Sequence, residues 1–91
     1  MRTPYYVYIL VCKDGAFYTG YTQDVEARMK LHKLGRGAKY VRTHQPEKVV
    51  YLEKFETRSD AMKREREIKR LTHAEKQKLT GLKVRVKSSE P

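Results

Sequence analysis

The sequence contains no long apolar run. In its 91 residues, no stretch approaches the ~18 to 20 apolar residues of a membrane-spanning helix, and the run Tyr5–Cys12 lacks the cleavage site of a signal peptide. Internal repeats and low-complexity segments are also missing, and the length allows only one modest core. We therefore expect a single-domain cytoplasmic protein.

Cysteine occurs once, at Cys12, so no disulfide can form within the chain. The three histidines, His32, His44 and His73, are scattered, and with a single cysteine they cannot form a four-ligand zinc site. A lone cysteine inside an apolar run is typical of a small buried side chain. Disulfide-stabilised and zinc-stabilised classes of protein are therefore excluded.

Acidic residues are scarce: 11 Asp and Glu face 21 Lys and Arg, which gives a net charge of +10. Such an excess favours nucleic acid or an anionic membrane surface as partner, although a basic surface can also serve solubility alone. Between Arg28 and Lys48, seven Lys and Arg face the single Glu47, and Gly35 and Pro46 indicate loops. We interpret this stretch as a surface that faces phosphate groups.

Two adjacent stretches are typical of a β-hairpin. Residues Tyr5–Cys12 are continuously apolar, β-branched or aromatic, which predicts a strand covered on both faces, and Phe17–Thr22 predicts the returning strand. The turn allows a two-residue or a three-residue loop. We choose the three-residue loop with a left-handed Gly15, because such loops favour glycine at their last position. In this register Leu10 pairs with Tyr18.

The chosen register places three tyrosines, Tyr6, Tyr8 and Tyr18, on one face of the hairpin. Gly20 lies inside the second strand, where glycine is costly unless another group packs closely against the backbone. The hairpin therefore predicts three phenols on one surface and a close contact at Gly20.

The rest of the chain predicts one more strand and three helices. Helix caps are indicated at Thr22 or Asp24, at Thr57 with Asp60, and at Thr72 with Glu75, and Gly81 indicates the last helix end. The expected elements are a helix over 25–34, a strand over 48–55, helices over 57–71 and 72–79 or 72–80, and an extended segment over 82–86. This order predicts an α+β fold: a small three-stranded antiparallel sheet flanked by helices, in the order β-β-α-β-α-α. We expect one domain over residues 1–82 and a flexible tail over 83–91.

Three polar residues fall on helix faces that turn toward the protein body. Arg28 and His32 lie one turn apart, between two apolar groups of the first helix, and Glu65 lies almost at the centre of the apolar stripe of the second. A carboxylate at such a position is costly unless a charged group meets it. Lys69, one turn later, is a candidate partner.

Each of these residues has an ordinary structural explanation, since tyrosines form strands well and Glu65 can pair with Lys69. Their combination is informative, because phenols, an arginine, an imidazole and a carboxylate could converge beside a cation-rich loop. A carboxylate can hold a hard divalent cation, an arginine can stabilise a pentacovalent phosphate, and a phenol or imidazole can take a proton from water. The set therefore supplies the parts needed to cut a phosphodiester.

These residues resemble the GIY-YIG nuclease superfamily over roughly residues 5–71. The likeness consists of Tyr6-Val7-Tyr8, of Tyr18-Thr19-Gly20, and then of Arg28, His32 and Glu65 in order. Four strings resemble the small stand-alone bacterial members of the YhbQ type: YVYIL from Tyr6, YTG from Tyr18, GAKY from Gly37 and EIKRL from Glu67.

The resemblance implies a small antiparallel sheet with the site on one face, and a role for each site residue. Glu65 would coordinate a single Mg²⁺ or Mn²⁺ ion, and Arg28 would bind and stabilise the scissile phosphate. Tyr18, or else His32, would assist deprotonation of the attacking water. Tyr8 would orient water or phosphate through its hydroxyl group.

The sequence departs from the family pattern in three ways. The glycine that opens the first motif is Tyr6 here, the middle residue of the second is Thr19, and no Asn is present to match a downstream asparagine of some family nucleases. An appended DNA-recognition domain is not expected. Nucleic acid would then be bound mainly through its phosphates, which carry little sequence information. The candidate binding residues are Tyr6, Lys33, Arg36, Lys39, Tyr40, Arg42 and Lys69.

Three functions are compatible with the sequence. The first is a metal-dependent nuclease that hydrolyses phosphodiester bonds in DNA, including structured, damaged or single-stranded DNA. The second is a nucleic-acid-binding module with the nuclease fold that is inactive alone or needs a partner, and the third is a basic adaptor for an acidic protein. The complete set of Tyr, Arg, His and Glu favours the nuclease. We expect a monomer that binds nucleic acid and no membrane, with specificity from the basic loop or from a protein partner.

Overall fold

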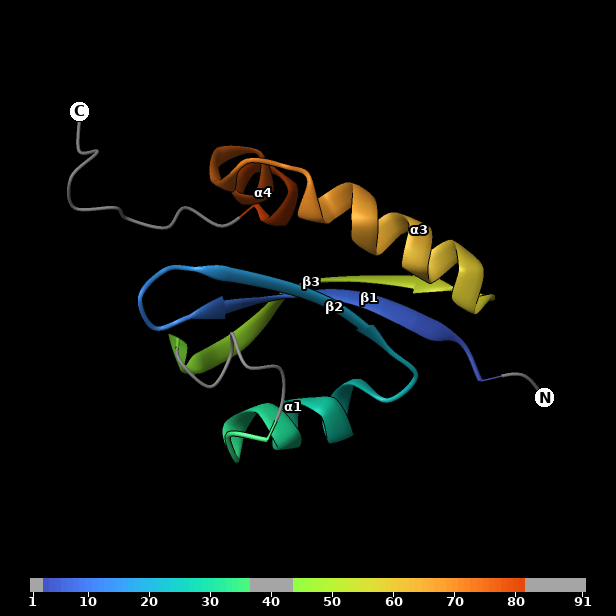
Figure 1. Ribbon diagram of the computed structural model, residues 1–91, viewed down its shortest axis with the longest axis horizontal. Coiled ribbons are helices and arrows are strands. Elements are labelled where there is room, and N and C mark those ends of the chain that lie inside the picture. The colour runs from blue at the N-terminus through green and yellow to red at the C-terminus, as the bar shows by residue number, and fades with distance from the viewer. Residues whose placement is uncertain (1–2, 37–43, 82–91) are drawn as a thin grey trace.

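The computed structural model describes residues 3–36 and 44–81, in which helices lie on both faces of a small sheet (Figure 1). In chain order the described elements are β1 (Tyr5–Cys12), β2 (Phe17–Thr22), α1 (Val25–Lys33), β3 (Pro46–Phe55), α3 (Arg58–Lys69) and α4 (His73–Thr80). The sheet is antiparallel with strand order β2-β1-β3, so β1 is central and β2 and β3 are edge strands. This arrangement confirms the predicted fold class and order of elements.

The β1–β2 hairpin has the predicted register, with Leu10 opposite Tyr18. Gly15 closes the turn with a φ of 86°, a conformation that glycine adopts without steric cost, and its N–H donates to Cys12 O at 2.9 Å. The three-residue loop thus determines which side chains of β1 and β2 share a face.

β3 is longer than the sequence pattern predicts. It begins at Pro46 rather than at Lys48, and Pro46 pairs with Cys12 at the end of β1. Proline is tolerated there because the first residue of an edge strand need not donate a hydrogen bond to the sheet.

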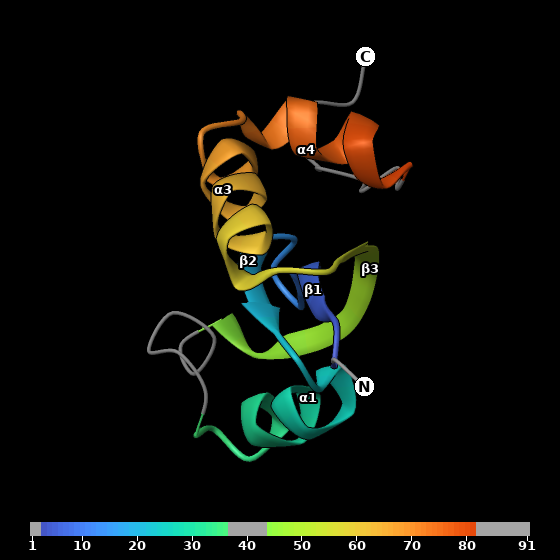
Figure 2. The ribbon, with the colours of Figure 1, turned by 90° about the vertical axis from the view of Figure 1, so that its right-hand side faces the viewer.

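α1 and α3 lie on opposite faces of the sheet (Figure 2), and each face carries its own apolar cluster. The larger cluster lies beneath α3 and α4 and contains the buried residues Val7, Ile9, Val11, Phe17, Ala61 and Ile68. The smaller one lies toward α1, where Tyr8 and Leu10 are buried and Tyr18, Met29 and Val49 pack against them. α1 and α3 therefore enclose the sheet from opposite sides.

The helices begin where the sequence predicts. Their N-caps are Asp24 for α1, Thr57 for α3 and Thr72 for α4. α1 and α3 end slightly earlier than predicted, at Lys33 and Lys69, because Leu34 and Arg70 act as their C-caps. Gly81 ends α4 with a left-handed φ of 68°.

Two predictions about the C-terminus, the extended segment over 82–86 and the tail over 83–91, lie outside the described residues. Within residues 3–36 and 44–81, no helix is both long and apolar enough to cross a membrane.

Candidate active site

A cavity of about 500 Å³ lies beside β2, where this edge strand leads into α1. Its lining residues are Tyr5, Tyr8, Tyr18, Gly20, Tyr21, Thr22, Gln23, Asp24, Arg28 and Glu65. Because α1 and α3 cover opposite faces of the sheet, Arg28 and Glu65 reach the cavity from opposite sides. The cavity therefore joins side chains from two different layers of the fold.

Gly20 makes room for the hydroxyl group of Tyr8. The two residues are register partners on neighbouring strands. A Cβ atom at Gly20 would lie 2.6 Å from Tyr8 Oη and 2.8 Å from Tyr8 Cζ, closer than such atoms can approach. The end of the Tyr8 side chain thus lies directly against the backbone of β2. This contact is the close approach that the sequence predicts at Gly20.

His32 of α1 lies behind Tyr8 and is 1% exposed. His32 Nε2 and Tyr8 Oη are hydrogen-bonded at 3.1 Å, and the Tyr18 ring meets the imidazole edge-on with ring centroids 5.6 Å apart. Burial lowers the pKa of His32, and the Arg28 cation lowers it further, so the imidazole is neutral at pH 7. Burial also raises the pKa of Tyr8, helped by Tyr18, so its hydroxyl group keeps its proton.

Arg28 and Glu65 differ in how far they are exposed. Arg28 is exposed on α1, whereas the Glu65 side chain is 16% exposed on α3. Lys69 Nζ lies 3.5 Å from Glu65 Oε2, so the carboxylate has the charged partner that its position requires.

Four of the five predicted catalytic residues line this one cavity: Tyr8, Tyr18, Arg28 and Glu65. The fifth, His32, is not among the lining residues and meets Tyr8 from behind. The structure thus gathers all five predicted residues and places His32 one side chain further from solvent.

The predicted nucleic-acid-binding residues are more dispersed. Lys69 adjoins the cavity through Glu65. Three more of these residues belong to the part of the chain that the structure describes but do not line the cavity: Tyr6, Lys33 and Arg36. Those outside the described residues are Lys39, Tyr40 and Arg42. Lys48, at the end of the basic stretch, belongs to β3. Because β1 lies between β3 and β2, Lys48 is on the other edge of the sheet from the cavity. The basic stretch over residues 28–48 therefore does not lie beside the cavity as a whole.

The cavity has five further lining residues that the sequence pattern does not place at the site: Tyr5, Tyr21, Thr22, Gln23 and Asp24. Tyr5 and Tyr21 belong to the face that packs against the larger apolar cluster. They reach the cavity because it extends around the edge of β2, which strand alternation alone does not reveal. The sequence identifies Asp24 only as a helix cap, and its Oδ1 indeed accepts a hydrogen bond from Ala27 N–H at 3.0 Å.

The groups that face the cavity suit a hard divalent cation, because the Glu65 carboxylate and the tyrosine hydroxyl groups offer oxygen atoms. In the part of the chain that the structure describes, no group of three His, Cys, Asp or Glu side chains could hold a metal ion. A cation at Glu65 would therefore keep most of its ligands as water, as Mg²⁺ commonly does.

Comparisons with known proteins agree with this geometry. The family model described as GIY-YIG catalytic domain matches residues 4–79. UPF0213 proteins of Staphylococcus haemolyticus and Staphylococcus saprophyticus are 51% and 49% identical to this chain over 75 residues, which cover 82% of it and 92% of each relative.

Two solution NMR structures are similar as well. A UPF0213 protein of Bacillus halodurans aligns with a TM-score of 0.55 at 48% identity, and a protein of E. faecalis aligns with a TM-score of 0.61 at 41% identity. Each alignment covers 88% of this chain and 85% of the other. With its predicted motif residues gathered at one cavity and these matches over most of its length, the chain belongs to the GIY-YIG catalytic domain family.

Proposed function

We propose that the protein is a metal-dependent nuclease that hydrolyses phosphodiester bonds in DNA, including structured, damaged or single-stranded DNA. The family to which it belongs is a nuclease family. The observation that carries the proposal is the convergence of Tyr8, Tyr18, Arg28 and Glu65 on one open cavity from four different elements.

Arg28 supplies positive charge to the reacting phosphate. A guanidinium group is always protonated and can donate two parallel hydrogen bonds to phosphate oxygens, which strengthen as negative charge develops in the transition state. The exposed Arg28 side chain lines the cavity, so a phosphate can reach it without rearrangement of the fold.

Tyr18 accepts the proton of the attacking water at its phenolic oxygen while its own O–H proton passes to solvent; as the P–O ester bond of the DNA backbone breaks, the departing sugar oxygen takes a proton from solvent water. We assign this role to Tyr18 rather than to His32 because Tyr18 lines the cavity, whereas His32 reaches it only through Tyr8. The Tyr8 and Tyr18 rings lie close together, with centroids 6.3 Å apart, and both residues line the cavity.

His32 positions Tyr8. Among the described residues, Nδ1 of the neutral His32 has no hydrogen-bond partner. A buried N–H without an acceptor is rarer and costlier than an unpaired lone pair, which favours the tautomer with the proton on Nε2. His32 then donates to Tyr8 Oη, and the Tyr8 hydroxyl group donates into the cavity, where it orients water or phosphate.

Glu65 would hold a single Mg²⁺ or Mn²⁺ ion, since GIY-YIG nucleases are generally metal-dependent. When bound, such an ion supplies charge neutralisation at the phosphate and a more acidic water. The cation would compete with Lys69 for the carboxylate, and the displaced ammonium group could then contact phosphate.

The ion pair between Glu65 and Lys69 also favours a second candidate function. A carboxylate that is already neutralised by its own helix attracts a cation less strongly. In that case the protein is a nucleic-acid-binding module that is inactive alone and needs a partner to release Glu65.

The test is incubation of the full chain with supercoiled, single-stranded and branched DNA in Mg²⁺ or Mn²⁺, beside Arg28→Gln and Lys30→Gln. Lys30 is an exposed cation of the same helix that does not line the cavity. We expect Arg28→Gln to lower the cleavage rate by ~10²- to 10³-fold, and Lys30→Gln, which removes the same charge, to have little effect. Equal cleavage by both variants would contradict the proposal, and salt-sensitive binding without cleavage of any substrate would favour the binding module.

A further inference from the structure

The charges of α3 are divided between two sides of the helix. On the side toward β3, Arg64 donates hydrogen bonds to Glu53 of that strand at 3.0 Å and to Glu67 at 3.1 Å. On the side toward β2, Arg58 donates to Tyr21 Oη of that strand at 3.2 Å, and Glu65 lines the cavity. The two sides therefore face the two edges of the sheet.

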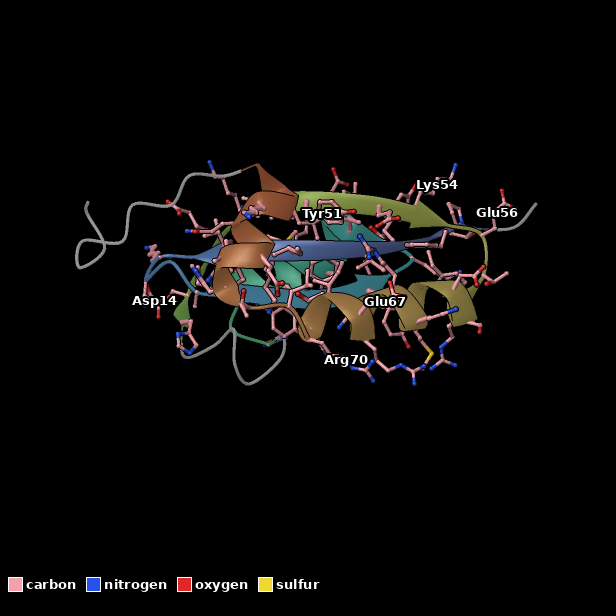
Figure 3. The ribbon with its side chains drawn as sticks, turned by 90° about the horizontal axis from the view of Figure 1, so that it is seen from above. Asp14, Tyr51, Lys54, Glu56, Glu67 and Arg70 are labelled. Atoms are coloured by element: carbon pink, nitrogen blue, oxygen red, sulfur yellow. The ribbon has the colours of Figure 1, made fainter. Side chains whose placement is uncertain are left out.

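The side of α3 toward β2 is basic. Arg58, Glu65 and Lys69 recur at helical spacing, seven and four residues apart, and so share this side. Arg66 adjoins them on the exposed surface, and its Nε donates to Met62 O at 3.4 Å. Figure 3 shows Arg70 and other nitrogen-tipped side chains extending from the side of α3 that is turned away from β3. The four residues Arg58, Glu65, Arg66 and Lys69 carry three positive charges and one negative charge, that of Glu65.

These cations form a row along α3, and two of them adjoin the cavity, because Arg58 bonds to the lining residue Tyr21 and Lys69 pairs with the lining residue Glu65. Arg58 and Lys69 are eleven residues apart, so they are separated by ~16 Å along the helix axis. One strand of B-DNA advances ~3.4 Å per nucleotide along its axis, so the row is long enough to follow several consecutive phosphates. The Arg58 side chain extends toward the cavity, because the tyrosine to which it donates a hydrogen bond, Tyr21, is a lining residue.

We propose that Arg58, Arg66 and Lys69 bind the DNA backbone phosphates that flank the phosphate held by Arg28. The DNA backbone would then run along β2, with α1 on one side and α3 on the other. This proposal deepens the proposed function, on which it rests, by naming the side of the cavity along which the substrate lies.

The test measures the dissociation constant of a short fluorescent DNA at several salt concentrations, without divalent metal so that no cleavage occurs. The variant Arg58→Gln/Arg66→Gln is compared with Lys48→Gln/Lys54→Gln, which removes two exposed cations from β3, the strand at the other edge of the sheet. We expect the first variant to weaken binding and to reduce the slope of log Kd against log salt by about one for each phosphate that the protein no longer binds. The β3 variant keeps the wild-type slope.

Equal slopes for the two variants would overturn the proposal, even if the wild-type protein cuts DNA. A parallel cleavage assay keeps the two proposals distinct. If the wild-type protein binds but does not cut, and the α3 variant alone has a reduced slope, the α3 surface is supported while the nuclease function fails. If the slope falls equally in both variants, DNA binding depends on the net charge of the protein, and Arg58, Arg66 and Lys69 do not form a specific binding surface.

Discussion

The two faces of the sheet use similar side chains for different purposes. On the α3 face, Tyr51 Oη donates to Glu53 at 2.7 Å, and Arg64 donates to the same carboxylate, so these groups satisfy one another. On the α1 face, Tyr8 is supported by His32 from behind and turns toward an open cavity. Tyrosine, arginine and glutamate thus occur both in the Tyr51–Glu53–Arg64 group and at the cavity. The candidate site differs from that group because its polar side chains line an open cavity.

Damage to the apolar cluster beneath α3, which does not include Glu65, should therefore cost stability rather than chemistry. Ile68 is fully buried there, in the larger apolar cluster. Ile68→Ala should lower the free energy of unfolding by ~2 to 5 kcal/mol, measured by urea denaturation, because it leaves a cavity. The protein that is still folded at low temperature should cleave DNA at close to the wild-type rate. A fully folded variant that has lost cleavage would contradict this division of roles between the two faces.

A change on the α1 face should do the reverse. Gly20→Ala would place a Cβ atom 2.6 Å from Tyr8 Oη and displace the hydroxyl group from its bond with His32. Misplacement of a catalytic group by an ångström can cost ~10²-fold in rate, whereas the loss of stability from overpacking is expected to be ~1 to 3 kcal/mol. Single-turnover cleavage and thermal unfolding measure the two effects.

Gly35→Ala is the matched control for Gly20→Ala. Gly35 has a φ of +73°, and a Cβ atom there would meet nothing within 4 Å. The substitution should therefore cost ~1 to 2 kcal/mol of stability through backbone strain and leave the cleavage rate unchanged. A rate loss in both glycine variants would show that strain, and not the contact with Tyr8, controls activity.

The smallest predicted effect is a pH dependence of stability that originates on the α1 face. The pKa of His32 is lower in the folded protein than its ordinary value of ~6.5. As the pH falls through that value the unfolded chain binds more protons than the folded one, so stability is lost below pH ~6.5 and the loss levels off below the folded-state pKa. His32→Gln should show a smaller decrease in melting temperature from pH 8 to pH 5. Identical pH profiles for the two proteins would show that His32 is not responsible.

Much of the fold could be predicted because local signals agree with tertiary packing. Gly15 determines the hairpin turn, and the N-caps of the described helices determine where those helices begin. The run Val49-Val50-Tyr51 is less informative, because its continuous apolar character hides the shift in pairing that occurs opposite Ile9 and Leu10. Strand alternation fails at such a bulge.

The candidate site could be predicted in its residues but not in its layout. Gly20 and the inward position of Glu65 both contradict local preference, which marks them as special in the sequence alone. Two features depend on how the helices dock on opposite faces of the sheet: the depth of His32 relative to Tyr8, and the fact that Glu65 and Arg28 line the same cavity. Periodicity gives the face of a helix and not its position over the sheet.

Two carboxylates of the same helix allow the sharpest test of the catalytic assignment. Glu65 lines the cavity, whereas Glu67 accepts a hydrogen bond from Arg64 at 3.1 Å on the other side of α3. The measurement is the single-turnover rate of DNA cleavage by Glu65→Gln and by Glu67→Gln in saturating Mg²⁺ or Mn²⁺. We predict a loss of ~10²-fold or more for Glu65→Gln and a rate close to wild type for Glu67→Gln. Equal rates for the two variants would contradict the assignment of this cavity as the active site.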